Sequence, residues 1–456
     1  MEHEVVRRAR LNKKPHGDAG IRAIAFLPLC NPRAGFGTGF VYRQLMKSQW
    51  WQHASLEAIQ EKKLNRLLNY AVTNVPFYRD YFIEGGFHGE GARAKVARLP
   101  ILTKDQIRRS AHLMCMRFPP KGIVFRATTG GTTGEPIEIW KSMNSLSVAA
   151  AAFWRGMLWS GIKPWDKGVI VQGFGGGSWY GRIRMRSVRK WGVESFRASE
   201  ERRKMARSLI MRVQPSYVEG FVTDLLRLGE TKDLVSCGIR QVLTTGEMLY
   251  ENQRTQLMEC FNARVSDYYG SNEINSIAYE CELGNKHVTD EHVILETVDD
   301  GGEPVWGEPG RILVTDLDND VMPLVRYELG DVGVLSTEPC ACGRQLTVLK
   351  ALLGRTQESI RNSAGESLSA TFFAGKFKDL KSVHRFQLIQ KSLTSVELLF
   401  EAGKGDVEPE INKVISEIHA RLGQQISVTA IAVPNLQLTP AGKCPLVIGM
   451  KTNEGE

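Results

Sequence analysis

Apolar residues recur at helical spacing in the first part of the chain. Between Ser55 and about Val72 they come three or four positions apart, as on one face of a helix, at Leu64, Leu67, Leu68 and Ala71. We expect Ser55 to cap this helix and Pro76 to close the segment. Further along, Thr103 and Gln106 have the spacing of a capping box, which predicts the start of a second helix.

The middle of the chain alternates short apolar runs with helical segments. The runs that read as strands are Val169–Gln172, Tyr217–Gly220, Val242–Thr244, Val265–Tyr269 and Ile312–Thr315. Strands separated by helices are typical of βαβ units. The pattern therefore predicts an α/β body with a mostly parallel sheet.

The pattern changes at about Thr356. Two alternating runs, His384–Gln390 and Thr394–Phe400, predict a hairpin. An amphipathic helix over Ile411–Leu422 should end at Gly423, and a strand should follow over Ile426–Val433. We therefore expect a large domain over residues 1–355 and a small α+β domain over residues 356–456, which is an ordinary domain size.

Composition narrows the class of protein. The chain has 456 residues, of which 42% are hydrophobic and 24% charged, as in a globular protein. Its longest apolar runs fall short of the roughly 18–20 residues that a membrane span needs, and its first twenty residues do not resemble a secretory signal. We expect a cytoplasmic protein without a membrane span.

Charge and cysteine content argue against a nucleic-acid-binding protein and against a disulfide-stabilised protein. The formal charge of +9 fits solvated faces, or attraction of phosphorylated small molecules, better than a nucleic-acid groove, because no basic stripe with aromatic residues accompanies it. Eight cysteines in a chain of this length argue against a disulfide framework. We expect no nucleic-acid partner.

A segment rich in glycine and threonine carries the first candidate chemistry. Residues 126–136 read Arg-Ala-Thr-Thr-Gly-Gly-Thr-Thr-Gly-Glu-Pro, and the candidate phosphate contacts are Thr128, Thr129, Gly130, Gly131, Thr132, Thr133 and Gly134. The glycines let the backbone approach a ligand, and the threonine hydroxyls can hydrogen-bond a polyphosphate. The segment lacks the lysine of the GxxxxGK[ST] phosphate loop. A surface turn is the alternative reading.

Four residues form a second candidate site. Three thiols and one imidazole, from Cys281, His287, Cys340 and Cys342, are a Cys₃His set of the kind that holds tetrahedral zinc. Gly343 would permit a tight turn toward the metal, and His292 is a nearby imidazole that could exchange roles with His287. The alternative is four residues buried or solvated separately. The remaining cysteines lack metal spacing and should be core or loop thiols.

Residues 126–136, called the phosphate-loop segment from here on, and four later segments together resemble the adenylate-forming enzyme superfamily, in its phenylacetate–CoA ligase and CapK-like branch. The later segments are Thr245-Gly246-Glu247, residues 268–273 (Tyr-Tyr-Gly-Ser-Asn-Glu), residues 326–331 (Arg-Tyr-Glu-Leu-Gly-Asp) with Gly354-Arg355-Thr356, and residues 439–443 (Thr-Pro-Ala-Gly-Lys). They occur in the family's order and span most of the chain. Relatives in this branch share a similar Cys/His arrangement, which favours structural zinc.

The resemblance assigns a role to each segment. Glu273 would hold Mg²⁺, which prefers carboxylate oxygen, and Asp331 would accept both ribose hydroxyls. Tyr269 would lie against the adenine, with Gly246 and Glu247 along its edge, and Gly270 and Asn272 would belong to the same nucleotide site. Lys443 would bridge the substrate carboxylate and the α-phosphate as charge develops. Arg355 would mark the hinge on which the small domain moves between half-reactions.

Each of these residues also has a structural alternative. Asp331 could be a turn residue, Tyr269 a core residue and Glu273 a carboxylate at a helix N-terminus. The chain also departs from the family pattern, with Glu135 in place of a lysine, Gly131 in place of a hydroxyl residue, and Asn272 in place of Ser or Thr. These changes weaken an assignment to phenylacetate itself.

The expected function is an ATP-dependent, AMP-forming ligase that adenylates a carboxylic acid, expected to be aromatic, and transfers the acyl group to coenzyme A. Transfer to an amine is the first alternative, and a non-catalytic nucleotide-binding protein is the second. Residues 174–180 (Phe-Gly-Gly-Gly-Ser-Trp-Tyr) could wall the acid pocket or form a surface loop. The sequence does not determine the oligomeric state, for which a dimer is one option.

Overall fold

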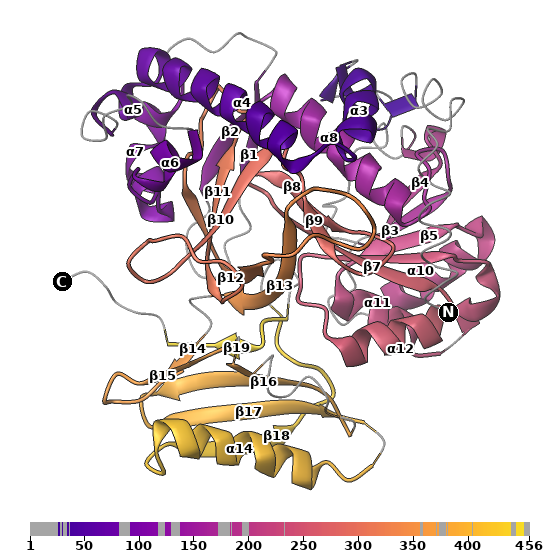
Figure 1. The fold of residues 1–456 in the computed structure, drawn as a ribbon. Helices are drawn as coiled ribbons and strands as arrows, with labels where there is room; N and C mark the ends of the chain where they lie inside the picture. Colours follow the sequence, from indigo (N-terminus) through magenta and orange to yellow (C-terminus); the bar gives the residue numbers. More distant parts are fainter. Residues whose placement is uncertain are drawn as a thin grey trace.

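The protein folds into a large part built on one long sheet and a small part built on a second sheet (Figure 1). The computed structural model describes residues 26–27, 30, 34–35, 37–81, 92–116, 124–128, 137–171, 183, 185–193, 200–231, 233–355, 359–370, 372–373, 380, 382–403, 405–438 and 444–450. Among these residues, no helix is long and apolar enough to cross a membrane.

The long sheet has eleven strands in the order β10-β11-β12-β13-β9-β8-β7-β6-β5-β3-β4. In chain order they are β3 (Gly168–Val171), β4 (Lys190–Val193), β5 (Tyr217–Gly220), β6 (Gln241–Thr245), β7 (Arg264–Ser271), β8 (Asn275–Glu280), β9 (Lys286–Val288), β10 (Val293–Val298), β11 (Gly310–Asp316), β12 (Tyr327–Leu335) and β13 (Val348–Arg355). The fold is a mixed α/β structure, as the sequence predicted.

Only one end of this sheet is parallel. Strands β3 to β7 run parallel to their neighbours, whereas every pairing from β7 through β10 is antiparallel. The expectation of a mostly parallel sheet was therefore wrong for Ile312–Thr315, which lies in β11. Parallel neighbours need a crossover connection, and no helix lies between β7 and β13 to provide one.

Helices supply the crossovers in the parallel half. They are α10 (Glu200–Val213), α11 (Val222–Gly229) and α12 (Glu251–Phe261), and a short 3₁₀ helix, η3 (Asp233–Cys237), precedes β6. Their buried residues pack with those of β3, β5 and β6 in one apolar cluster, which includes Cys237 and Cys260. These two thiols are core residues, as expected.

A second group of helices covers the other side of the large part (Figure 1). It comprises α3 (Gly37–Ser48), α4 (His53–Asn74), α5 (Pro76–Tyr81), α6 (Ala92–Ala97), α7 (Lys104–Met114) and α8 (Met143–Trp159). The two-stranded ribbon of β1 (Val124–Thr128) and β2 (Glu138–Ser142) leads into α8.

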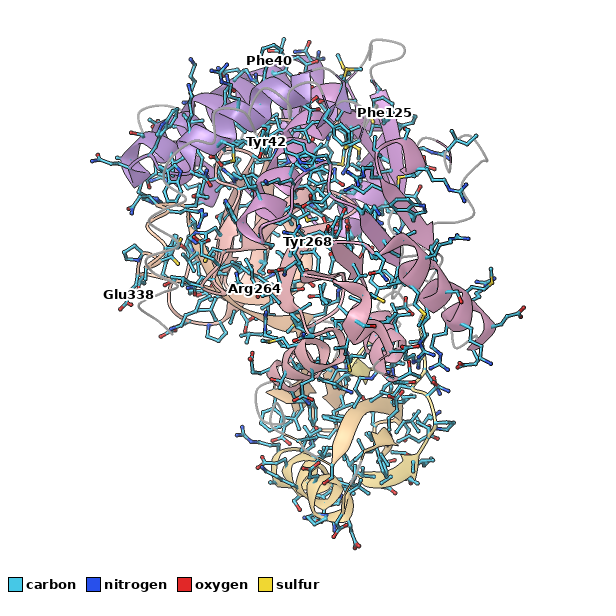
Figure 2. The ribbon with its side chains drawn as sticks, turned by 90° about the vertical axis from the view of Figure 1, so that its right-hand side faces the viewer. Phe40, Tyr42, Phe125, Arg264, Tyr268 and Glu338 are labelled. Atoms are coloured by element: carbon cyan, nitrogen blue, oxygen red, sulfur yellow. The ribbon has the colours of Figure 1, made fainter. Side chains whose placement is uncertain are left out.

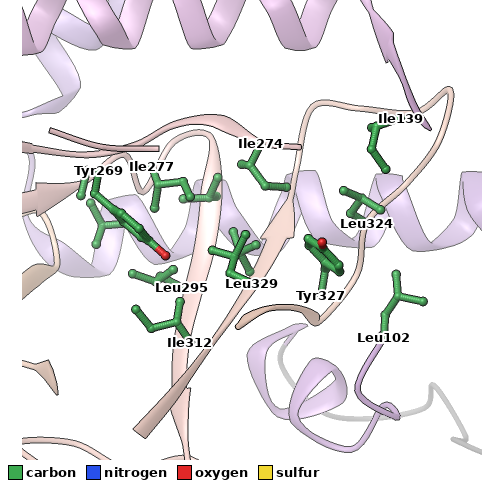
Figure 3. Packing of buried hydrophobic residues seen from close by; sticks show 14 of the residues in the cluster. Leu102, Ile139, Tyr269, Ile274, Ile277, Leu295, Ile312, Leu324, Tyr327 and Leu329 are labelled. Atoms are coloured by element: carbon green, nitrogen blue, oxygen red, sulfur yellow. The ribbon is translucent and has the colours of Figure 1, made fainter. Parts of the chain in front are cut away.

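The antiparallel half encloses its own core. Residues from β7, β8, β10, β11 and β12 meet there with Ile139 of β2 and Leu102, the residue two positions before α7 (Figure 3). Leu102 also bridges to Tyr327, because its N–H donates to Arg326 O and its carbonyl accepts from Glu328 N–H. This bridge brings the start of α7 next to β12.

The small part is a four-stranded sheet in the order β18-β17-β16-β19 with one helix (Figure 1). Its elements are β16 (Val383–Ser392), β17 (Ser395–Ala402), α14 (Glu408–Leu422), β18 (Ser427–Ala432) and β19 (Val447–Ile448), and the two-stranded pair β14 (Ser359–Arg361) and β15 (Ser367–Ser369) precedes them. The predicted hairpin is the antiparallel pair β16–β17, and α14 ends at Gly423. Both predictions are confirmed.

Of the two helix starts predicted from the sequence, the one at Thr103 is confirmed and the one at Ser55 is not. The capping box is confirmed, since the Thr103 hydroxyl accepts from Gln106 N–H and the Gln106 side chain accepts from Thr103 N–H. The cap at Ser55 was wrong, because α4 begins at His53 with Gln52 as its N-cap. Pro76 does end that helix, and it opens α5.

Candidate active site

A cavity lies between the long sheet and the small sheet. The large part contributes Thr223, Gly246, Tyr269 and Asp331 to its walls, and the small part contributes Phe373, Arg385 and Cys444. Tyr268 also lines the cavity, and it lies in the middle of the large part (Figure 2). Residues from motifs far apart in the sequence therefore meet in one place.

Asp331 is held from two sides. It lies within β12, opposite Arg355 of β13, so the reading of Asp331 as a turn residue was wrong. The Tyr269 hydroxyl donates to Asp331 Oδ2 at 2.7 Å, and Arg355 Nε lies 3.2 Å from Asp331 Oδ1. Burial raises the pKa of Tyr269 well above its usual value, so this hydroxyl stays a donor. The carboxylate is thus oriented within the cavity before any ligand binds.

Glu273 lies in the tight turn between β7 and β8. No helix begins there, so the reading of Glu273 as a helix N-terminal carboxylate was wrong. Its side chain is buried, and Oε1 accepts from the Tyr327 hydroxyl at 3.1 Å. Gly270 makes the turn possible, since a Cβ at this position would lie 2.0 Å from the carbonyl oxygen of Asn275.

Asn272 joins this turn to the start of the phosphate-loop segment. Its Nδ2 donates to the carbonyl oxygen of Thr128, the last residue of β1, at 3.3 Å. Thr128 therefore lies beside the turn that carries Glu273. The other predicted phosphate contacts, Thr129, Gly130, Gly131, Thr132, Thr133 and Gly134, lie outside the described residues.

Gly246 and Glu247 line the cavity just after β6, with Gly246 in a left-handed conformation (φ +74°). The Glu247 carboxylate accepts two backbone N–H groups, from Thr223 at 2.8 Å and from Cys444 at 2.9 Å. Glu247 thus connects α11 to the chain just after Lys443. Both of its oxygens are engaged by protein, so this segment presents mainly its backbone to a ligand.

Lys443 lies outside the described residues, as do Glu135 and residues 174–180. Their roles stay predictions.

Two lysines near the site were missed by the sequence analysis. Lys104, at the start of α7, lies within electrostatic range of Glu273, Asp331 and Arg355, and burial lowers its pKa. Lys141 of β2 is buried near Glu273 and Asp316, and burial lowers its pKa to about 8. No motif identifies either residue, because the contacts between β2, α7 and the long sheet bring them to the site.

The four predicted zinc ligands converge. Ligand atoms of Cys281, His287, Cys340 and Cys342 all lie within 4.8 Å of one another, and all four residues are buried. The Cys281 and Cys340 sulfurs are 3.9 Å apart, too far for a disulfide, and Cys342 Sγ lies 3.2 Å from His287 Nε2. The alternative of four separate residues was wrong.

The surroundings of the cluster fit a metal centre. His287 Nδ1 lies 3.3 Å from the carbonyl oxygen of Leu346, an arrangement that turns Nε2 toward the thiols. Backbone N–H groups of Leu283 and Cys342 and the side chain of Asn285 donate to the sulfurs of Cys281 and Cys340. The hydrogen bond between Cys281 and Cys340 lowers the pKa of Cys340 and raises the pKa of Cys281.

His292 does not belong to the cluster. Its Nδ1 lies 3.0 Å from Asp318 Oδ2, in a separate buried group with Asp316. The exchange of roles with His287 was therefore wrong. The tight turn at Gly343 is confirmed by its φ of +87°.

The cluster ties together the two segments that carry the nucleotide residues. Cys281 directly follows β8, which begins after Glu273, and Cys340 and Cys342 follow β12, which contains Asp331. A metal at this position would fix the relative placement of the two segments.

Comparisons with known proteins agree with this geometry. Residues 360–450 match the model of the CapK C-terminal domain. The phenylacetate-coenzyme A ligase of Thermus thermophilus is 28% identical over 322 residues, which cover 67% of this chain and 71% of that protein.

Solved structures match the fold as a whole. The crystal structure of 2-hydroxyisobutyryl-CoA ligase in the postadenylation state has a TM-score of 0.71 at 18% identity, and the match covers 89% of this chain and 93% of that one. The chain is thus similar in sequence to phenylacetate–CoA ligases and in fold to an acyl-CoA ligase.

The arrangement of the large and small parts can be compared with two of the states in which this neighbour has been solved. The same 2-hydroxyisobutyryl-CoA ligase in its thioesterification state has a TM-score of 0.58 at 20% identity, with 87% of this chain and 90% of that one covered. The higher score of the postadenylation state indicates that the domains of this chain are arranged more nearly as in that state.

Proposed function

We propose that the protein is an ATP-dependent, AMP-forming acid–CoA ligase. The observation that carries the proposal is the convergence of Tyr269, Asp331 and Arg355 on the cavity between the two sheets. Glu273 lies in the turn that follows the strand of Tyr269, with Thr128 beside that turn. The relatives that are named phenylacetate-coenzyme A ligases support coenzyme A as the acceptor.

The proposed chemistry has two steps. A carboxylate oxygen of the acid attacks the α-phosphorus of ATP, the bond to the bridging oxygen breaks, and pyrophosphate leaves. The thiolate of coenzyme A then attacks the acyl carbon, and AMP leaves. The first step needs positioning and positive charge near the α-phosphate, because a carboxylate and a polyphosphate repel each other.

The residues of this chain divide these tasks. Asp331, oriented by Tyr269 and Arg355, would accept the ribose hydroxyls, and the phosphate-loop residues would hold the polyphosphate. Lys443 would contact the α-phosphate as charge develops there. Glu273 is a buried carboxylate suited to Mg²⁺, which when bound would neutralise phosphate charge.

An aromatic acid is the proposed substrate class. The names of the relatives support it, and so do the aromatic side chains near the cavity. The ring of Tyr268, which lines the cavity, stacks on Tyr279 at 5.3 Å and meets the edge of Phe153 at 5.7 Å.

The proposal includes structural zinc at the Cys/His cluster. All four ligand positions would be filled by protein, so no position is open for a catalytic water. It also includes domains at 1–355 and 356–456, a hinge at Arg355, and a cytoplasmic location, where thiols stay reduced. The amine acceptor and the dimer stay predictions.

Pyrophosphate release from ATP, measured across a panel of aryl, arylacetic and aliphatic acids, tests the proposal. We expect release that depends on the acid, and a thioester product only when coenzyme A is present. Product formation with amines instead of coenzyme A would favour the amide ligase. No acid-dependent release with any panel member would favour a non-catalytic nucleotide-binding protein.

Replacing Asp331 with alanine should raise the KM for ATP about 10- to 100-fold, because two hydrogen bonds between a carboxylate and the ribose would be lost. Steady-state kinetics with varied ATP measures this change. Asp300→Ala, at an exposed position in the loop after β10, is the matched control and should behave like the wild type. An unchanged KM for ATP in Asp331→Ala would contradict the ribose assignment.

A further inference from the structure

A hydrogen bond from an arginine of the small sheet joins the two parts of the molecule. Arg385 of β16 donates through Nη1 to the Thr223 hydroxyl, the second residue of α11, at 2.6 Å. Its Nη2 donates to Glu401 Oε1 of β17 at 3.0 Å. The guanidinium is largely buried, with 11% of the side chain exposed. It therefore connects a carboxylate of its own domain to a hydroxyl of the other.

A second arginine, from the large part, lies near the same carboxylate. Arg227 of α11 lies 3.7 Å from Glu401 Oε1, and only 7% of its side chain is exposed. Glu401 thus lies between one arginine from each part of the molecule. Charged contacts are stronger where water is excluded, so this group favours the docked arrangement.

The third contact lies beside the predicted catalytic lysine. Glu247 accepts the N–H of Thr223 through Oε2 and the N–H of Cys444 through Oε1. Cys444 directly follows Lys443 in the sequence. Thr223 is therefore engaged through its hydroxyl by Arg385 and through its N–H by Glu247, which in turn holds the chain next to Lys443.

These contacts belong to one arrangement of the domains. The chain matches the postadenylation state of its structural neighbour with a TM-score of 0.71 and the thioesterification state with 0.58. A rotation of the small part away from α11 would break the bond between Arg385 and Thr223 and the contact between Arg227 and Glu401.

We propose that Arg385 is a positioning residue, which docks the small domain on α11 and so presents Lys443 for adenylation. The inference rests on the proposed function. Arg385 would act on the first half-reaction alone, because the second requires the small domain to leave this position. Loss of the contact raises the population of undocked molecules. The rate of adenylation then falls in proportion to the docked population that remains.

Thr223→Val gives the sharpest test, because valine keeps the shape of the side chain and the backbone N–H to Glu247 but removes the acceptor of Arg385. Arg385→Met removes the other partner. Each variant should lower acid-dependent ATP–pyrophosphate exchange about tenfold, as expected for one charged hydrogen bond. The double variant should be no slower than Arg385→Met, since both changes remove the same contact.

The second half-reaction separates positioning from a general structural role. Thioester formation from preformed acyl-adenylate should keep the wild-type rate or exceed it in both variants. Lys391→Ala is the control, because Lys391 pairs with Glu397 inside the small domain at 2.9 Å, and it should leave both half-reactions unchanged. Equal losses in the two half-reactions, or unchanged exchange in Thr223→Val, would overturn the inference.

A measurement that needs no turnover keeps the inference independent of the proposed activity. Small-angle scattering of the substrate-free protein should show a larger radius of gyration for Arg385→Met than for the wild type and for Lys391→Ala. Identical scattering curves would count against docking by Arg385. A wild-type protein without acid-dependent exchange would instead refute the proposed function.

Discussion

Replacing Lys443 with alanine should slow acyl-adenylate formation by about 10²–10³-fold and leave the affinity for ATP almost unchanged. The ammonium is needed where charge develops between the acid and the α-phosphate, so its loss affects the transition state far more than the ground state. ATP–pyrophosphate exchange measures the rate, and equilibrium nucleotide binding measures the affinity.

The second half-reaction provides the contrast for this prediction. Thioester formation from preformed acyl-adenylate should survive in Lys443→Ala, because the lysine has no part in it. Lys413→Ala, at an exposed position of α14, should retain both rates. An equal loss in the two half-reactions of Lys443→Ala would show that the lysine has no specific role in adenylation.

Replacing Cys340 with serine should remove most of the zinc and lower the Tm by roughly 5–10 °C, because one of the four ligands is lost and the segments that they join come apart. Metal analysis and thermal unfolding should show this first. Activity should then fall through a rise in the KM for ATP. Asp331 lies in β12, the strand that leads to Cys340, and it would lose its placement.

A matched cysteine variant completes the zinc experiment. Cys115 lies outside the cluster and is half-buried, so Cys115→Ala should keep the metal. The wild-type protein, never exposed to chelator, should carry about one zinc per chain. Less than about half an equivalent in the wild type would refute the four-ligand site.

The proposed docking contact of Arg385 with Thr223 and the proposed catalytic Lys443 both act on adenylation, but by different means. Lys443 would lower the barrier itself, whereas Arg385 would set how often Lys443 is in position. The two roles therefore differ in magnitude: a change in the population of a docked state costs only the contact that is lost, about tenfold here, whereas a charge needed in the transition state costs much more.

Local patterns in the sequence were sufficient for elements whose structure depends on near neighbours. The capping box at Thr103, the strand Tyr217–Gly220, the hairpin of β16 and β17 and the end of α14 at Gly423 all follow from residues within a few positions of one another. The Cys/His cluster was also predictable, because few residue types can hold zinc and their set is recognisable at any separation in the chain.

The direction of the strands and the partners of the site residues were decided by the tertiary structure alone. The sequence did not show that Ile312–Thr315 pairs antiparallel, that Glu273 lies in a hairpin turn, or that both oxygens of Glu247 are engaged by backbone N–H groups. Nor did it place Lys104 near Asp331, since the bridge between Leu102 and Tyr327 brings the two together.

The physical reason is the range of the interactions. The sequence by itself determined most element types, the membership of the Cys/His cluster and the family resemblance, because these depend on residue chemistry and on short spacings. Strand order, the clustering of charges at the cavity and the docking of Arg385 on Thr223 depend on contacts between different elements of the fold. Arg385 and Thr223, for example, are 162 positions apart. Such contacts are specified only when the whole core packs, and the structure alone decided them.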